Sequence, residues 1–154
     1  MTQLTSTRHT DLLNGYKSGE SRFREWADEH LGNLHLLHWE AGEIRMRWDM
    51  DEHMIMPDGV MFGGHISSVA DHVVGLTTMT VLSEETDRFR TSRLETNFFR
   101  PLKMPRATVE GKITNLSRSL VHVEADFYNS DDRLAVRSSA VQVLTGNAER
   151  ALHR

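Results

Sequence analysis

The sequence contains no cysteine. This absence excludes a disulfide framework, a thiolate metal site and a catalytic thiol. Proline is also scarce, with 3 residues in 154, so few positions force a break in a helix or strand. No stretch approaches the roughly 18 apolar residues of a membrane-spanning helix, and the first ten residues lack the apolar run of a signal peptide. We therefore expect a cytoplasmic protein without a membrane partner.

An excess of basic residues is missing as well. The chain has 18 Lys and Arg against 22 Asp and Glu, a formal net charge of −4. Nucleic-acid-binding domains present a net basic surface, so we expect no nucleic-acid partner. The sequence also lacks the phosphate-binding loop with its Lys, the G-x-G-x-x-G nucleotide fingerprint and the G-x-S-x-G elbow of serine hydrolases.

What remains is an ordinary globular composition, with 38% apolar and 26% charged residues. A length of 154 residues suits one domain. We divide the chain into an N-terminal helical extension (1–32), a core (33–146) and a polar tail (147–154).

The extension is expected to begin with disorder over residues 1–9 and to continue with two short helices. Thr10 can cap the first helix, and Ser18 or Ser21 the second. Phe23, Trp26 and Ala27 have the i, i+3, i+4 spacing of a core-facing side. We expect these helices to pack as a flap, which either shapes a substrate pocket or serves only as a lid or dimer contact.

From residue 33 the apolar residues recur with a period of two, which is typical of strands with one buried face. The pattern predicts strands over about 34–39, 44–50, 88–99, 106–116, 119–128 and 133–144, with a long helix between the second and the third. A sheet with one buried face needs an apolar element to cover it. The prediction is therefore an α+β domain in which one antiparallel six-stranded sheet wraps around one long helix.

That helix lies in the stretch P-D-G-V-M-F-G-G-H-I-S-S-V-A-D-H-V-V-G-L-T-T-M-T-V-L, from Pro57 to Leu82. At about 100° per residue it divides into two faces. The face expected to pack on the sheet consists of Ile66, Val69, Ala70, Val73, Val74, Thr77 and Val81. The second face has small or polar residues: Gly64, Ser67, Ser68, Asp71, Gly75 and Thr78. It fits either a close dimer contact or a substrate channel.

Asp71 stands out because aspartate is a poor residue for a helix interior. Gly63 and Gly64 at the helix start leave backbone N–H groups free, and the helix dipole adds positive potential there. Such groups can hold a developing oxyanion. A carboxylate two turns later can act as general base or nucleophile on the same carbonyl. Together they suit hydrolysis of an activated acyl group such as a thioester.

At this point the residues match a known family. G-V-M-F-G-G-H-I-S-S-V-A-D (59–71) resembles the G-x-x-H-G-G-x-x-x-x-x-x-D signature of hotdog-fold acyl-CoA thioesterases of the phenylacetate-degradation (PaaI-like) type. T-S-R-L-E-T-N-F-F-R-P (91–101) resembles that family's following strand, which ends in Arg-Pro. The resemblance covers roughly residues 20–146. It implies a hotdog fold and a homodimer with two sites at the subunit interface, or a tetramer made of two dimers.

The resemblance also implies an enzyme, a thioester hydrolase that needs no cofactor because CoA is part of its substrate. Asp71 falls on the catalytic carboxylate. Gly63, with Gly64 beside it, falls on the glycine whose N–H holds the thioester oxygen. Thr91 falls on a hydroxyl position that helps to place the water, supplied by the partner subunit. Arg118 lies in a turn where it can meet CoA phosphate or simply face solvent.

Two positions depart from the family pattern. The histidine before the glycine pair is Phe62 here, and histidine follows the pair as His65. The upstream amide of many members falls near Met56, with Asp58 as the nearest polar side chain. These changes predict a more apolar pocket mouth. The substrate-binding residues that we expect are Phe62, Met56, His65, Ser67, Ser68 and Arg118.

Other functions were weighed against this one. His65 with His72, or His122 with Glu124 and Asp126, lacks a recognised metal-ligand spacing, so we expect no metal. A dehydratase of the same fold would need a paired catalytic His and acid that are not found. The main alternative is a non-catalytic hotdog dimer that binds acyl-CoA or another apolar ligand. Neither the acyl group nor the base or nucleophile role of Asp71 follows from the sequence.

Overall fold

A computed structural model describes residues 5–83 and 88–145 of the chain. Two helices precede the sheet, α1 (Thr7–Ser18) and α2 (Arg22–His30). The Ser6 side chain accepts a hydrogen bond from the His9 backbone N–H and so caps α1. This cap starts the helix before Thr10, so the expected disorder is wrong for residues 7–9. Ser21 caps α2 as predicted. The predicted tail (147–154) lies outside the described residues.

Six strands form one antiparallel sheet. Its order is β1-β2-β4-β5-β6-β3. β1 and β3 are therefore the two edge strands, and β3 pairs with β6. The strands match the predicted segments to within about two residues. Their bounds are β1 Asn33–Glu40, β2 Glu43–Asp49, β3 Arg88–Phe98, β4 Arg106–Leu116, β5 Leu120–Tyr128 and β6 Leu134–Thr145.

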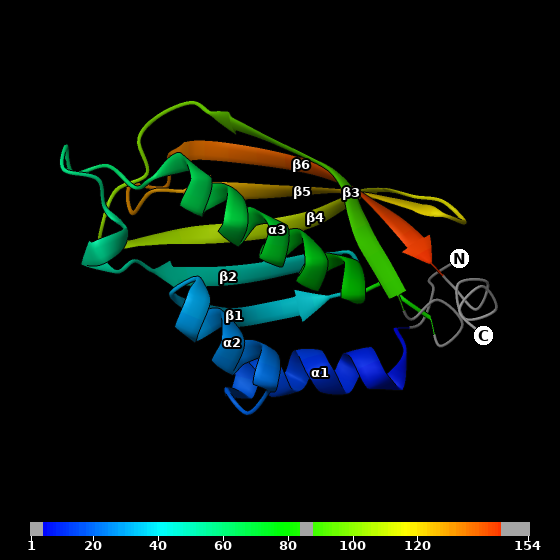
Figure 1. The fold of residues 1–154 in the computed structure, drawn as a ribbon. Coiled ribbons are helices and arrows are strands. Elements are labelled where there is room, and N and C mark those ends of the chain that lie inside the picture. Colours follow the sequence, from blue (N-terminus) through cyan, green and yellow to red (C-terminus); the bar gives the residue numbers. More distant parts are fainter. Residues whose placement is uncertain (1–4, 84–87, 146–154) are drawn as a thin grey trace, which may run out of the picture.

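The long helix α3 (Gly63–Met79) lies along one face of this sheet, while α1 and α2 lie beside β1 (Figure 1). A short 3-10 helix, η1 (Glu52–Met54), stands in the loop before α3. Every residue of the predicted sheet-facing stripe is buried: Ile66, Val69, Ala70, Val73, Val74, Thr77 and Val81. The predicted α+β hotdog fold, a sheet around one central helix, is confirmed.

α3 approaches the sheet closely because β4 has a glycine beneath it. A Cβ atom on Gly111 would lie 2.0 Å from Oγ1 of Thr77 and 3.0 Å from a side-chain carbon of Ile44. The first separation is shorter than real Cβ contacts and the second is tighter than nearly all of them, so the observed packing needs glycine at this position. The buried Thr77 hydroxyl donates to the Val73 carbonyl oxygen, 2.7 Å away, and is thereby satisfied.

Two expectations about helix faces are wrong. Thr78 was placed on the small, accessible face, but it is buried and donates its hydroxyl to the Val74 carbonyl oxygen. Phe23 and Trp26 were placed in the core, but they are 47% and 48% exposed. Ala27 is buried as predicted, and Arg24 is buried in place of the two aromatic residues. The Arg24 guanidinium bonds Asp28 on its own helix, so it can be covered without losing its partner.

No helix in the described parts of the chain combines the length and apolar character needed to cross a membrane.

Candidate active site

The edge strand β3 lies against α3, and an irregularity in β3 keeps its side chains directed at the helix. The pairing of β3 with β6 shifts register between Thr91 and Arg93. Phe89 and Thr91 meet α3 before this bulge, and Thr96 and Phe98 meet it after the bulge. A bulge inserts one residue and so changes the phase of a strand.

Asp71 and Thr91 form the centre of the candidate site. Oγ1 of Thr91 donates a hydrogen bond to Oδ1 of Asp71, 2.8 Å away, and Asp71 is exposed. Both residues belong to one chain, which corrects the expectation that Thr91 is delivered by the partner subunit. Oγ1 of Thr91 also lies 3.1 Å from Oε1 of Gln142. Gln142 is fully buried on β6 and was not predicted from the sequence.

The start of α3 is built for close approach of aromatic rings. Phe62, the residue before the helix, provides no side-chain cap, so in the described chain no side chain caps the first N–H groups. A Cβ on Gly63 would lie 3.1 Å from the ring of Phe98, and one on Gly64 would lie 2.7 Å from the ring of Phe62. The glycine pair thus combines free N–H donors with two half-exposed aromatic rings.

One chain cannot bring these donors to Asp71. Asp71 follows Gly63 by eight residues, which corresponds to about 12 Å along an α-helix. A reacting carbonyl needs its oxyanion donors and its base or nucleophile each at about 3 Å. The expectation that Gly63, Gly64 and Asp71 act on one carbonyl therefore does not hold within a single chain.

Four of the six predicted binding residues line one of two pockets, and Ser67 and Arg118 line neither. Ser68, Asp71 and Thr91 line a pocket of about 450 Å³ between α2, α3 and β3. Met56, Phe62 and His65 line another of about 400 Å³ at the N-terminal end of α3. Three side chains are already engaged: Ser67 with Thr96 (3.2 Å), Ser68 with the Gly64 carbonyl (3.1 Å), and His65 with the Leu31 carbonyl (3.1 Å).

His72 also lines the Asp71 pocket, although the sequence analysis considered it only as a metal ligand. Its Nε2 lies 3.0 Å from the Tyr16 hydroxyl of α1. Burial lowers the pKa of His72 from 6.5 to about 4, and the nearby Asp71 charge opposes this only in part. Burial also raises the pKa of Tyr16. At neutral pH the pair is therefore an uncharged hydrogen bond beneath Asp71. In the sequence His72 cannot be told from a surface histidine, because its partner Tyr16 lies far away in the chain, on α1.

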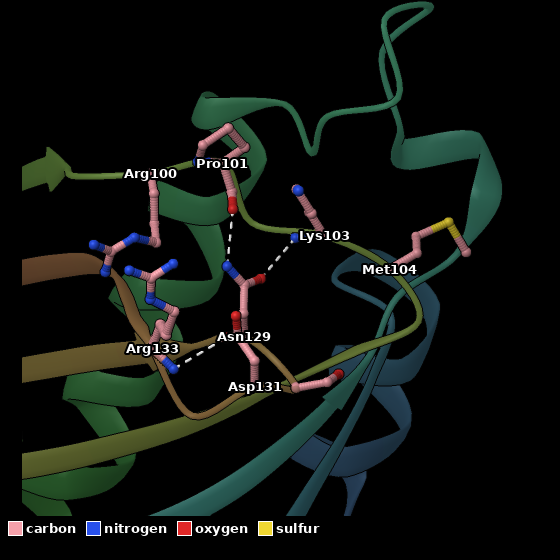
Figure 2. A pocket seen from close by; sticks show the side chains of 8 residues that line it. Arg100, Pro101, Lys103, Met104, Asn129, Asp131 and Arg133 are labelled. Atoms are coloured by element: carbon pink, nitrogen blue, oxygen red, sulfur yellow. Dashed lines mark hydrogen bonds between the residues drawn. The ribbon is translucent and has the colours of Figure 1, made fainter.

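Arg118 is exposed in the turn between β4 and β5. That turn lies at the other end of the sheet from the N-terminal end of α3 (Figure 1). Basic residues gather instead just after β3, in a pocket of about 370 Å³ (Figure 2). Arg100, Lys103 and Arg133 line it together with the single carboxylate of Asp131. The Asn129 side chain fixes this loop by donating to the Pro101 carbonyl (2.9 Å) and accepting from the Lys103 N–H (2.9 Å).

Among residues 5–83 and 88–145, no three His, Asp or Glu side chains come together in a way that could hold a metal ion. Asp126, one of the residues considered for such a site, instead accepts two hydrogen bonds from the Arg137 guanidinium, at 2.7 and 2.8 Å.

Several known proteins share this fold. A protein of Saccharolobus solfataricus that is named as an esterase is 27% identical over 106 residues, which cover 69% of this chain and 74% of its own. A hypothetical thioesterase of Streptococcus pneumoniae TIGR4, solved with coenzyme A, has a TM-score of 0.73 at 17% identity over 80% of this chain and 94% of its own. Its variants with one aspartate or one threonine replaced by alanine are similar too, with TM-scores of 0.66 and 0.68, each at 16% identity over 74% of this chain and 92% and 91% of theirs.

A phenylacetic acid degradation-related protein of Ralstonia eutropha JMP134 has a TM-score of 0.73 at 19% identity, over 86% of this chain and 99% of its own. At these identities the solved structures support the fold alone. Membership follows from the family model of the thioesterase superfamily, which matches residues 58–136 and thus just over half of the chain, from before the glycine pair through β6's first residues. The chain belongs to the thioesterase superfamily.

Proposed function

We propose that the protein is an acyl-CoA thioesterase that hydrolyses its substrate to a free acid and CoA. The hydrogen bond between Thr91 and Asp71, in the wall of a pocket, carries this proposal. A thioester needs little acid assistance because thiolate is a good leaving group. A carboxylate at the carbonyl and N–H donors at its oxygen are then sufficient.

Two routes are consistent with this pair. Acting as a base, Asp71 takes a proton from water, the hydroxide forms a bond to the carbonyl carbon, and the C–S bond breaks; the proton then passes to the thiolate of CoA. Acting as a nucleophile, Asp71 displaces the thiolate to form an anhydride, which water then cleaves. In both routes the Thr91 hydroxyl holds one carboxylate oxygen and leaves the other facing the substrate.

The oxyanion donors are proposed to come from a second copy. A two-fold axis relates residue i of one subunit to residue j of the other in both directions. Antiparallel pairing of two α3 helices about such an axis brings Gly63 and Gly64 of the partner subunit to Asp71. The same axis brings Gly63 and Gly64 of this chain to the partner's Asp71, so the dimer has two equivalent sites. Two features support the close approach that such a homodimer needs: the small residues on this face of α3, and the outer edge of β3, which pairs with no other strand among residues 5–83 and 88–145. A tetramer would join two such dimers.

The pocket at Arg100, Lys103 and Arg133 is proposed to take the phosphates of CoA. It follows directly after Phe98, whose ring covers Gly63, and arginine side chains suit phosphate recognition. The similar S. pneumoniae structure that contains coenzyme A supports a CoA ester as the substrate class. The role that the resemblance assigned to Arg118 thus passes to this cluster.

Release of free thiol from a panel of acyl-CoA esters tests the proposal. Replacing Asp71 by alanine or asparagine should lower kcat about 10²–10⁴-fold, the usual contribution of a general base. Thr91→Val, which keeps the side-chain shape, should also lower kcat. Asp11→Asn, an exposed carboxylate on α1, should leave the activity unchanged.

The support for this mechanism includes the S. pneumoniae thioesterase variants, since one aspartate and one threonine were replaced there. Full activity of Asp71→Ala would contradict the mechanism. Tight binding of CoA esters by the wild-type protein without thiol release would instead favour the non-catalytic dimer. One observation favours that alternative. Phe62 stands where the family signature has histidine, and its ring packs over Gly64.

A further inference from the structure

The Asp71 pocket extends well beyond the carboxylate. Along α3 it is lined by Ser68, Asp71, His72, Gly75, Leu76 and Met79. These positions follow the i, i+3, i+4 spacing of one helix face. Met79 lies eight residues after Asp71, about 12 Å further along the helix axis. A ligand group whose reacting atom meets Asp71 therefore has room to continue towards Met79.

The walls of the part of the pocket between Asp71 and Met79 are aromatic. Trp26 and Phe23 from α2 form one side, and Phe89 from β3 forms the other. The Trp26 ring is held by stacking on His30 at a centroid distance of 4.8 Å and lies 6.0 Å from the ring of His72. Gly75 keeps the floor open, since a Cβ there would already touch the Phe89 ring at 3.7 Å.

Few charged side chains line this part of the pocket beyond Asp71. Burial lowers the pKa of His72 to about 4, so His72 is neutral at physiological pH. Arg90 is the one cation among the described residues of the lining, and its guanidinium donates to the Phe89 carbonyl oxygen, 2.8 Å away. A largely aromatic cleft of this size favours an apolar ligand group. Phe23 and Trp26 lie outside the family-matched region (58–136), so this wall is supplied by the N-terminal extension of this chain.

We propose that this pocket holds the acyl group of the substrate and that the N-terminal extension selects thioesters of medium-length aliphatic or aromatic acids over acetyl thioesters. This inference rests on the proposed function. Asp71 and Thr91 line the same pocket as Phe23 and Trp26, so an acyl carbonyl at Asp71 directs its tail between α2 and β3. The N-terminal extension (1–32) is then part of the substrate pocket. The two alternatives, a lid or a dimer contact, are outcomes of the test below.

The test compares kcat/KM for acetyl-, butanoyl-, hexanoyl-, octanoyl- and phenylacetyl-CoA. Each added methylene should raise kcat/KM roughly four-fold until the pocket is filled, as expected from apolar burial. Trp26→Ala should lower kcat/KM for octanoyl- and phenylacetyl-CoA by about ten-fold or more and leave acetyl-CoA nearly unchanged. Leu37→Ala, which removes an exposed apolar side chain on β1, is the matched control.

Gly75→Leu gives a second test that does not depend on removing a packed side chain. Leucine is a better helix former than glycine, so the helix is retained while the added side chain fills the pocket next to Phe89. This variant should lose at least ten-fold more of its kcat/KM on octanoyl-CoA than on acetyl-CoA. Equal kcat/KM for acetyl- and octanoyl-CoA in the wild type, or equal effects of Trp26→Ala on both, would overturn the proposal.

Failure of the proposed function is distinguishable from failure of this inference. If no ester is hydrolysed, calorimetric binding decides the inference. Octanoyl-CoA should bind at least ten-fold more tightly than CoA to the wild type, and this difference should be lost in Gly75→Leu. Equal dissociation constants for octanoyl-CoA and CoA would overturn it.

A separate observation concerns Gln142. Its side chain is fully buried, and its Nε2 has no hydrogen-bond partner while its Oε1 faces Oγ1 of Thr91. The Thr91 hydroxyl has one proton, and that proton is used in the bond to Asp71. Oε1 and Nε2 exchange places by a half-turn of the amide, so the hydrogen-bond pattern decides their positions. A half-turn gives Thr91 a donor in place of a second acceptor.

We infer that Gln142 is a positioning residue whose Nε2 donates to Oγ1 of Thr91, which obliges Thr91 to donate to Asp71. The three side chains then form one directed hydrogen-bond chain from β6 through β3 to α3. Gln142 and Thr91 are direct partners in the β3–β6 register, so the sheet itself holds the two side chains together.

The side-chain NH₂ signals of Gln142 in an NMR spectrum test this orientation without requiring activity. Thr91→Val should shift these signals and speed their exchange with solvent, while Thr114→Val, on β4, should not. Unchanged Gln142 signals in Thr91→Val would overturn the inference.

Kinetics supply the readout for the positioning role. In Gln142→Met, the pH of half-maximal activity on the acid side should rise, because Thr91 then holds the carboxylate less firmly. This pH would fall if Gln142 instead competed with Asp71 for the proton of the Thr91 hydroxyl, and a fall would overturn the positioning role of Gln142. In a Thr91→Val background the further effect of Gln142→Met on kcat should vanish. Melting temperatures of the single variants separate this result from misfolding.

Discussion

At the scale of single residues, Asp71 and His72 show how one step along a helix changes chemistry. Successive residues point about 100° apart around α3. Asp71 therefore reaches Thr91 on β3 and solvent, whereas His72 is directed under the N-terminal extension and meets Tyr16. One side chain is available to a ligand, and its neighbour is a neutral part of the pocket floor.

This burial predicts a pH-dependent stability. The pKa of His72 is 6.5 in the unfolded chain and about 4 in the folded one. Between these pH values the unfolded chain binds more protons, so the free energy of unfolding falls as the pH falls, by about 3 kcal/mol in total from this group. Urea unfolding at pH 4 and at pH 7 measures the difference, and His72→Asn should reduce it.

His38→Asn is the control for this measurement, because His38 is exposed on β1. An equal loss of stability on acidification in His72→Asn and in the wild type would contradict the assignment. Other groups that titrate in this range contribute equally to both proteins, so the difference between the two proteins reports on His72.

At the scale of elements, α3 has two different faces, and the sequence determined both to a large extent. The apolar period of the helix predicted every buried residue of its sheet-facing stripe. The strands were predicted by alternation, since one face of each is buried. The role of α2 could not be predicted, because Phe23, Trp26 and Ala27 share a helical spacing but only contact with β1 decides which of them is covered.

Two glycines give opposite predictions for stability. Gly111→Ala would place a methyl group 2.0 Å from Oγ1 of Thr77, which should cost about 1–3 kcal/mol or more as overpacking. Gly75→Ala would place one at an ordinary contact distance from Phe89, 3.7 Å, and should stabilise α3 by up to about 1 kcal/mol. Thermal unfolding of the two variants measures both effects. A Gly111→Ala variant as stable as the wild type would disprove the close approach of α3 to β4.

At the scale of the whole molecule, the proposed mechanism needs a second subunit. About 12 Å of helix separates Gly63 from Asp71, so in the proposed dimer each chain supplies the carboxylate of one site and the N–H donors of the other. The sedimenting mass should accordingly be at least twice the 17.7 kDa of the chain. A monomer that hydrolyses thioesters at full rate would contradict the shared site.

Mixed dimers test which chain supplies each group. Gly63→Pro removes one N–H donor at the first helical position, where proline is well tolerated, and Phe62 already has the extended backbone that precedes proline (φ −61°, ψ 126°). Gly63→Pro and Asp71→Ala homodimers should each be nearly inactive. Mixing them should restore activity, because each hybrid contains one intact shared site. Thiol release that stays absent in verified hybrids would refute a site shared between subunits.

The sequence by itself determined the order of elements and the buried stripe of α3, and it indicated Asp71 with Gly63 and Gly64 as a candidate site. These follow from local periodicity and from short spacings within one segment, whereas Thr91 was indicated only by the family resemblance. Only the tertiary structure decided that Thr91 meets Asp71 of its own chain, that Gln142 lies behind it, and that Phe23, Trp26 and His72 line the pocket. Those contacts join residues far apart in the sequence, and the strand order that places β3 beside β6 and α3 has no local signal in the chain.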